Sequence, residues 1–222
     1  MFIFILIFIH ELGHFETARI FKFEVDKIYL YPTGGISKFT SKINVSWYKE
    51  LLVLINGPLS QIIIYFLLIR FYPYKNSLIT LKYIHYSILL FNLLPIYPLD
   101  GGKVLNLFLN RIFSFKTSFN LTIIFSYIFI FLLLIIINFS FKINYLFVIS
   151  FLIYKLVEEQ TKFKYYYDKF LLERYLYSFS FNKICVVPSF NKFRKNYEHI
   201  ISNNRGVFLE KEELNKKFSN FL

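Results

Sequence analysis

Cysteine is nearly absent from this chain, and acidic residues are scarce. The one cysteine, Cys185, permits no internal disulfide and no cysteine-based zinc cluster, and we expect it to be a small buried residue of a strand. Only 14 aspartates and glutamates stand against 26 lysines and arginines, which gives a formal charge of +12. The sequence contains no helix-turn-helix or zinc-knuckle pattern, which argues against nucleic-acid binding. The basic residues gather in loops between apolar runs and in the tail, where the positive-inside rule of membrane proteins explains them.

The N-terminus also lacks the features of a secretory signal peptide. It has no basic start and no small-residue cleavage site, and the most informative motif of the chain lies inside its first apolar run. Only nine residues precede His10. They span about 13 Å of helix, which is less than half of a bilayer core. We therefore expect that a further membrane helix precedes this stretch in the full protein.

Apolar residues, by contrast, are abundant. They make up 56% of the chain, with 30 phenylalanines and 18 tyrosines, and the mean hydropathy is +0.47. A soluble domain of this size does not need so much apolar surface, and several windows reach the length of a membrane span. The sequence predicts an α-helical polytopic membrane protein with about five spans here and six in the full protein. The expected spans are residues 1–21, 50–71, 78–94, 117–138 and 143–157.

Residues 24–39, EVDKIYLYPTGGISKF, carry a different pattern. Apolar and polar side chains alternate around Pro32, Gly34 and Gly35, which predicts two short strands and a turn. This would be a small β-hairpin near the membrane surface. An ordinary connecting loop fits the pattern equally well.

The last part of the chain is polar and holds 13 of the 26 basic residues, from Lys155 onward. In it, residues 183–190 predict a strand, residues 191–201 a helix, and residues 206–214 a strand that runs into a turn. Such a tail is too short for a large core of its own. We expect three parts: an intramembrane domain (1–157), a linker helix (158–181) and a short α/β cytosolic tail (182–222).

The motif HELGH, residues 10–14, lies inside the first apolar run. Residues four apart share a helix face, so His10 and His14 point the same way and can take two corners of a tetrahedral zinc site. Glu11 lies beside them and is the usual general base of this motif. Ionisable groups at membrane depth cost roughly 2.5–3.5 kcal/mol each, so three of them within five residues indicate function. The alternative is two histidines packed in an apolar helix.

A catalytic zinc needs three protein ligands, so a third must come from elsewhere in the chain. Asp100 is the best candidate, because it lies between two apolar helices in PIYPLDGG, where Pro95 and Pro98 interrupt the helix. The alternative is a loop aspartate that caps a helix over residues 100–113. The basic loops place HELGH and Asp100 near the cytosolic ends of their helices, where they could meet.

Asn92, His85 and His199 are three further polar residues of types that catalysis uses. Asn92, about one helical turn before the break, either donates a hydrogen bond to the reacting carbonyl oxygen or satisfies broken backbone, and the sequence leaves both open. His85 and His199 have no partner at metal-ligand spacing and are expected to be structural. The expected reaction is hydrolysis, in which Glu11 takes a proton from the attacking water and passes it to the leaving amine.

Four motifs together resemble one known family. HELGH on a membrane helix, PTGG in the hairpin, NGP on the next span and NLLPIYPLDGG are similar to the site-2 protease family of intramembrane zinc metalloproteases, over roughly residues 1–175. The resemblance implies cleavage of membrane-associated substrates in or at the bilayer, with one zinc ion per chain. It also implies roles for six residues: the zinc ligands His10, His14 and Asp100, the catalytic Glu11, and Gly34 and Gly35 of a substrate-contacting strand.

A narrower resemblance rests on LLPIYPLDGGK and on FLLERY, residues 170–175. Both are similar to the sporulation branch of that family, the stage IV protease that processes pro-sigma-K in endospore-forming bacteria. This implies pro-sigma-K as substrate, inhibitory membrane partner proteins, and a place in the cell membrane or the outer forespore membrane. That branch carries a nucleotide-sensing C-terminal CBS domain, and residues 182–222 resemble a degenerate or shortened unit of this kind.

Three alternatives stand beside this reading. Another site-2-type protease would cleave a membrane-bound anti-sigma factor or a signal-peptide remnant. A prenyl-protein protease would need additional Glu and His ligands, whereas Glu11 and Glu16 are the only glutamates that we place within the membrane. An inactive membrane scaffold would gain nothing from an inserted set of two histidines, a glutamate and an aspartate.

Overall fold

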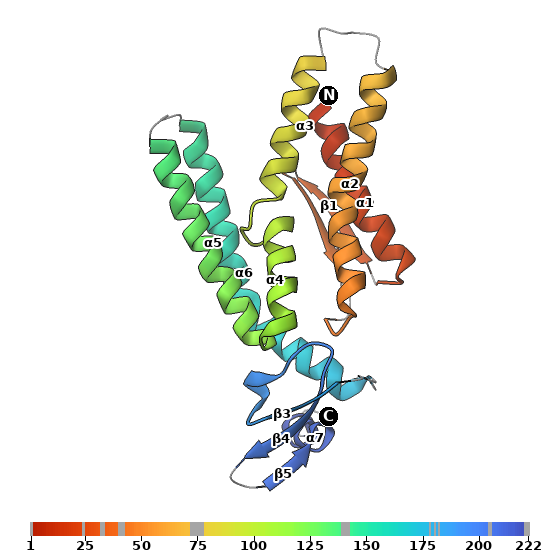
Figure 1. The fold of residues 1–222 in the computed structure, drawn as a ribbon, viewed down its shortest axis with the longest axis vertical. Coiled ribbons are helices and arrows are strands. Elements are labelled where there is room, and N and C mark those ends of the chain that lie inside the picture. Colours follow the sequence, from red (N-terminus) through yellow and green to blue (C-terminus); the bar gives the residue numbers. More distant parts are fainter. Residues whose placement is uncertain are drawn as a thin grey trace. The chain divides into compact units, whose positions relative to one another are not determined.

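The structure is a computed structural model, drawn in Figure 1, in which the chain divides into two compact units. The first unit is Met1–Lys42 with Tyr48–Leu94, and the second is Ile43–Trp47 with Pro95–Leu222. The structure describes residues 2–23, 25–31, 34–39, 43–71, 78–138, 143–177, 179, 181, 183–203 and 206–219.

Three helices and a hairpin make up the first unit. The helices are α1 (Phe2–Ile20), α2 (Trp47–Phe71, which starts in the second unit) and α3 (Leu78–Asn92). All three lie where the apolar runs predict helices. α2 continues through Pro58, whose ring and missing N–H usually disturb a helix. Buried Leu6, Tyr65 and Leu81, one from each helix, form the core of this unit.

The predicted hairpin is confirmed as a two-stranded antiparallel sheet. β1 (Val25–Tyr31) pairs with β2 (Gly34–Phe39), and the register sets Tyr31 opposite Gly34. The predicted turn at Pro32 lies outside the described residues. Both strands contact α1, so the hairpin lies against the helix that carries HELGH.

Three helices begin the second unit. They are α4 (Asp100–Ile112), α5 (Phe115–Asn138) and α6 (Ile143–Leu176). α6 joins the last predicted span and most of the predicted linker in one helix, as expected for a helix that continues beyond an apolar run. A polar stripe on α5 is satisfied by the helix itself, because each hydroxyl donates to a carbonyl one turn earlier. The donors are Ser118, Thr122 and Ser126.

The tail folds as a small α/β structure, which confirms that part of the prediction. β3 (Ile184–Val187) pairs in parallel with β4 (Glu198–Asn203), and β4 pairs antiparallel with β5 (Gly206–Leu209) before α7 (Glu210–Phe218). The hydrophobic core of the tail also includes residues of α5 and α6. The buried members are Phe115, Phe170, Leu171, Val187, Phe193, Ile201 and Leu214.

Two predictions for the tail are wrong. Residues 191–201 form the end of a short 3₁₀ turn (η2, Phe190–Lys192) and part of β4, not a helix, and Asn196 between them adopts a φ of 60°, which an α-helix does not allow. The predicted turn after β5 is instead α7. Glutamates in its first turn and lysines in its last turn complement the helix dipole.

Adjacent residues near the end of α6 hold the segment that leads into α2. The Glu173 carboxylate accepts hydrogen bonds from the backbone N–H groups of Ile43 and Asn44, at 2.7 to 3.0 Å. The next residue, Arg174, donates to Asn44 Oδ1 at 3.1 Å. Its guanidinium also contacts the Tyr197 carbonyl and the Glu210 carboxylate in the tail. α6 is therefore tied at this point both to residues 43–44 and to the tail.

Two helices within the described part of the chain are long and apolar enough to cross a membrane: α2, and α5 over Phe115–Ile136. Large apolar side chains also lie exposed on these helices and on α3 and α6. Examples are Phe66, Tyr83, Ile136 and Phe147. Exposed apolar surface of this extent is uncommon on soluble proteins and is typical of a lipid-facing surface.

Candidate metal centre

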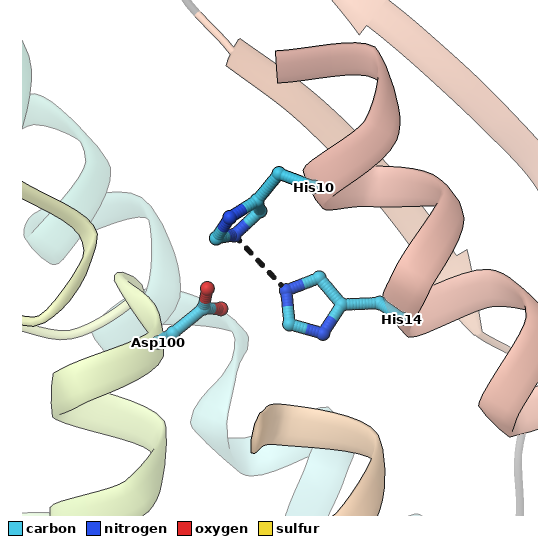
Figure 2. A group of neighbouring side chains, drawn as sticks. All are labelled: His10, His14 and Asp100. Atoms are coloured by element: carbon cyan, nitrogen blue, oxygen red, sulfur yellow. Dashed lines mark hydrogen bonds between the residues drawn. The ribbon is translucent and has the colours of Figure 1, made fainter. Parts of the chain in front are cut away.

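His10 and His14 lie one turn apart on α1 and face each other (Figure 2). Their Nε2 atoms are 3.2 Å apart, and both side chains are almost fully buried, with 2% and 6% of their surface exposed. The rings stand nearly perpendicular, at 80°. The sequence prediction that this pair shares one face is therefore confirmed.

The second nitrogen of each ring contacts α2. His14 Nδ1 lies 2.8 Å from the backbone carbonyl oxygen of Val53, and His10 Nδ1 lies 3.0 Å from the side-chain oxygen Oε1 of Gln61. A carbonyl oxygen only accepts, so His14 carries its proton on Nδ1 and presents the lone pair of Nε2. Metal-bound histidines in proteins are almost always held in this way by a partner on the other nitrogen.

The NGP motif explains how α2 comes so close. A β-carbon on Gly57 would overlap the imidazole of His14, and one on Gly13 would overlap Ser60 and the backbone of Asn56. Asn56 also donates from Nδ2 to the hydroxyl of Thr17. Glycine is therefore required at positions 13 and 57 for the two helices to meet around His14.

The pair of nitrogens fits a small tetrahedral cation. Two nitrogens bound to zinc at 2.0–2.1 Å with a tetrahedral angle stand about 3.3 Å apart, close to the 3.2 Å observed. Neutral imidazole nitrogen suits zinc and other late first-row metals.

Asp100, the predicted third ligand, lies in the second unit. It is buried, with 6% of its surface exposed, and is the first residue of α4, where the helix dipole favours a negative charge. Leu99, not Asp100, holds the N-cap position. Lys103 Nζ lies 3.3 Å from Oδ1 of Asp100. A β-carbon on Gly102 would overlap the backbone at Ile96, which accounts for the second glycine of LDGG.

The other residues predicted for the site lie on α1, α3 and β2. Glu11 is half-buried on α1, next to His10. Asn92 is the last residue of α3 and is half-buried. Gly34 and Gly35 begin β2, which, like β1, contacts α1. Within the first unit the structure thus brings the two histidines into direct contact, and it sets the hairpin beside their helix.

One residue beside the histidine pair was not recognised from the sequence. Gln61, on α2, is fully buried and contacts His10, and its amide nitrogen lies 3.0 Å from the backbone carbonyl oxygen of His85. The His85 ring stacks on Tyr65 with their centroids 3.9 Å apart. The available signal was a lone glutamine in an apolar run, which is uncommon at membrane depth.

A second buried polar cluster lies in the tail, where Arg174 and Glu210 form an ion pair beside His199. Burial lowers the pKa of His199 below its usual range, although its hydrogen bond to Glu210 opposes this. Burial would raise the pKa of Glu210, but hydrogen bonds from His199 and Arg174 outweigh it and hold that pKa at about 2. His199 therefore donates from Nδ1 to Glu210, and its Nε2 accepts from the backbone N–H of Arg194. The cluster joins α6, β4 and α7 through these contacts.

Comparison with known proteins gives one family model and several relatives. The model described as Peptidase family M50 matches residues 1–76 and 72–136. Stage IV sporulation protein FB of Bacillus subtilis (strain 168) is 33% identical over 177 residues, which are 77% of this chain and 62% of the relative. A zinc metalloprotease of Methanocaldococcus jannaschii is 30% identical over 123 residues, 52% of this chain and 35% of the relative. The chain therefore spans less than two thirds of the length of these curated relatives.

A solved structure also resembles this one. The site-2 protease from Methanocaldococcus jannaschii matches with a TM-score of 0.59 and 27% sequence identity, over 71% of this chain and 75% of that chain. HELGH and LDGG both lie within the residues that the family model matches.

Proposed function

Because the chain belongs to Peptidase family M50, we propose that it is an intramembrane zinc endopeptidase that cleaves a membrane-associated protein. The observation that carries this proposal is the pair of buried Nε2 atoms, 3.2 Å apart on an apolar helix. Two histidines that merely filled a core would not need this facing geometry. They would also not need partners that turn their Nε2 atoms toward each other.

His10, His14 and Asp100 are the proposed zinc ligands. Three properties of Asp100 support its inclusion: its carboxylate is buried, it lies in the first turn of α4, and it belongs to a motif inside the family match. Two imidazoles and one carboxylate leave a fourth position for water or substrate, as catalytic zinc sites require.

Zinc, when bound, supplies the positive charge that acidifies water and stabilises negative charge on a carbonyl oxygen. Glu11 takes the proton of the attacking water and later gives it to the leaving amine nitrogen. Asn92 donates a hydrogen bond to the carbonyl oxygen as negative charge develops there. Gly34 and Gly35 lie on a strand whose backbone can pair with an extended substrate segment. The contact between this strand and α1 supports the last assignment.

The proposed setting is a multi-pass membrane protein with five spans in this chain. The apolar, exposed surfaces of α2, α3, α5 and α6 support it, and the basic loops favour an active site near the cytosolic face. In this proposal, residues 1–157 form the intramembrane protease domain and residues 182–222 form a cytosolic, CBS-like tail. Residues 158–181 form the helix that links the two.

Pro-sigma-K is the proposed substrate, in the outer forespore membrane of an endospore-forming bacterium. The similarity to Stage IV sporulation protein FB over 77% of the chain supports this choice, together with the FLLERY stretch. Inhibitory membrane proteins are the proposed regulators.

Co-expression with tagged pro-sigma-K tests the proposal. We expect a shortened product with the wild-type chain and a loss of cleavage of about 10²- to 10⁴-fold with Glu11→Gln. Glu16→Gln, an exposed glutamate on the same helix, is the matched control and should cleave normally. Equal cleavage by wild type and Glu11→Gln would overturn the protease assignment. Cleavage of an anti-sigma factor or of a signal-peptide remnant in place of pro-sigma-K would overturn only the substrate.

A further inference from the structure

Gln61 is the one fully buried amide that contacts the histidine pair in the described part of the chain, and no motif assigns it a role. It lies on α2, one turn after Gly57 and one turn before Tyr65. Its side chain connects His10 on α1 with His85 on α3. A buried amide in an apolar helix requires partners for both its ends, because unpaired polar groups are costly there.

The partner on α3 fixes which way the amide points. Gln61 Nε2 lies 3.0 Å from the backbone carbonyl oxygen of His85 and 3.3 Å from Nδ1 of the same residue. A main-chain carbonyl oxygen can only accept, so the amide nitrogen must face it. The reverse orientation would set two acceptor oxygens against each other. Gln61 Oε1 therefore faces His10.

This orientation decides where His10 carries its proton. Gln61 Oε1 lies 3.0 Å from His10 Nδ1 and can only accept, so Nδ1 is the protonated nitrogen and Nε2 has the lone pair. His14 reaches the same state through the Val53 carbonyl. Both Nε2 atoms then present lone pairs 3.2 Å apart, an arrangement that suits a cation bound by both rings.

We propose that Gln61 is a positioning residue, which uses the His85 carbonyl to hold His10 as the Nδ1–H tautomer and thereby raises the affinity of the site for zinc. The inference rests on the proposed function in taking His10 and His14 as metal ligands. Without Gln61, the ring of His10 can place its proton on Nε2 and donate to His14. That contact competes directly with the metal. Partners of metal-bound histidines are typically worth 10- to 100-fold in metal affinity.

Zinc affinity of the full chain in nanodiscs, measured by competition with a chromophoric chelator, is the first test. Gln61→Met, which keeps the length and removes the acceptor, should weaken zinc binding about 10- to 100-fold. Gln61→Glu keeps an acceptor toward His10 but loses the N–H donor toward the His85 carbonyl, so it should lose less zinc affinity than Gln61→Met. His85→Phe is the matched control: it preserves the stacking on Tyr65 and the backbone carbonyl, and its affinity should stay within about threefold of wild type.

A spectroscopic readout separates positioning from packing. The chain has only four histidines, so ¹⁵N-histidine labelling gives a spectrum of four rings, and a His10→Ala variant assigns one of them. In the chain without zinc we expect His10 to carry its proton on Nδ1, and Gln61→Met should shift it toward the Nε2–H form. A merely structural role would lower thermal stability without changing this tautomer.

Three results would overturn the inference: His10 protonated at Nε2 in the wild type, unchanged zinc affinity in Gln61→Met, or an equal loss in Gln61→Glu and Gln61→Met. A failure of the proposed function looks different. In that case the wild-type chain binds no zinc and cleaves no substrate, whereas the tautomer measurement still reports on Gln61.

Discussion

Gly57 on α2 lies directly against the imidazole ring of His14 on α1. A β-carbon at position 57 would overlap ring atoms Nε2, Cε1 and Cδ2, so that the space for this side chain exists only while residue 57 is glycine. The ring is held from the same helix by the Val53 carbonyl, one turn before Gly57. The glycine of NGP thus leaves the space that the His14 ring occupies.

Gly57→Ala should displace the His14 ring and abolish zinc binding. The added methyl cannot be accommodated by a small shift, because its nearest neighbours are the atoms of a ring that is itself buried and hydrogen-bonded. Zinc content of the purified chain, measured by mass spectrometry, checks this. Leu59→Ala, at an exposed position of the same helix, is the control and should bind one zinc per chain. Full zinc content in Gly57→Ala would contradict the tight contact.

Asp100→Asn should weaken zinc binding by about tenfold or more. Loss of a residue that merely hydrogen-bonds to a metal ligand already costs about 10- to 100-fold in metal affinity, and loss of a ligand's charge should cost at least as much. The amide keeps the shape of the side chain but removes the negative charge that the cation needs. We expect the same chelator competition to register the loss, and cleavage to fall with it. Asp168→Asn, on α6 with its side chain half exposed, is the comparison variant. Wild-type affinity in Asp100→Asn would mean that the third ligand lies elsewhere.

Removal of the metal should stop cleavage reversibly. A membrane-permeable chelator is expected to inhibit the wild-type chain, and added zinc to restore it, because neutral imidazole and carboxylate ligands rebind the ion without a covalent change. The His10→Ala variant should contain no bound zinc, and added zinc should not restore its cleavage activity. Undiminished cleavage after complete removal of zinc would contradict a zinc mechanism.

Acid should destabilise the tail through two groups that act in the same direction. The pKa of Glu210 is lowered from 4.5 to about 2, so the stability it contributes is present above pH 4.5 and is lost as pH falls through about 2. The pKa of His199 is lowered from 6.5, so the unfolded chain takes up a proton first, and stability declines as pH falls below 6.5. Hydrogen–deuterium exchange of β4 and α7 across pH 7 to 3 measures both effects.

Glu210→Gln should remove the lower part of that pH dependence. It leaves the buried Arg174 without its charged partner, which costs about 3–5 kcal/mol at neutral pH. Glu213→Gln, which breaks a surface pair with Lys216, should cost less than about 1 kcal/mol. Equal exchange rates in the two variants would show that the Arg174–Glu210 pair does not hold the tail together.

The helices and the histidine pair could be predicted from the sequence because both depend on local patterns. The apolar runs predicted α2, α3 and α5 within a few residues, and the four-residue spacing predicted that His10 and His14 share one face. The family expected from four motifs is confirmed by the match to Peptidase family M50.

Non-local pairing explains what the sequence did not reveal. β4 forms because it pairs in parallel with β3, a contact that residues 191–201 alone do not encode, and Asn196 turns the chain into it. Gln61 and His85 are 24 residues apart and meet only when α2 and α3 pack together. His85 has no partner at metal-ligand spacing, so the sequence predicts a structural role for it, and the sequence does not show that its backbone carbonyl faces Gln61.

The double anchor at Glu173 and Arg174 bears on how this protein can be engineered. The two residues hold residues 43–44 and the tail at once, and the tail shares its core with α5 and α6. The tail is therefore poorly suited to domain exchange. If a foreign tail were joined at residue 182, Arg174 would remain in the chain, but its partner Glu210 would be replaced by a residue of the foreign tail. Chimaeras should instead take α4 through α7 together with residues 43–47, so that each graft carries its own anchor.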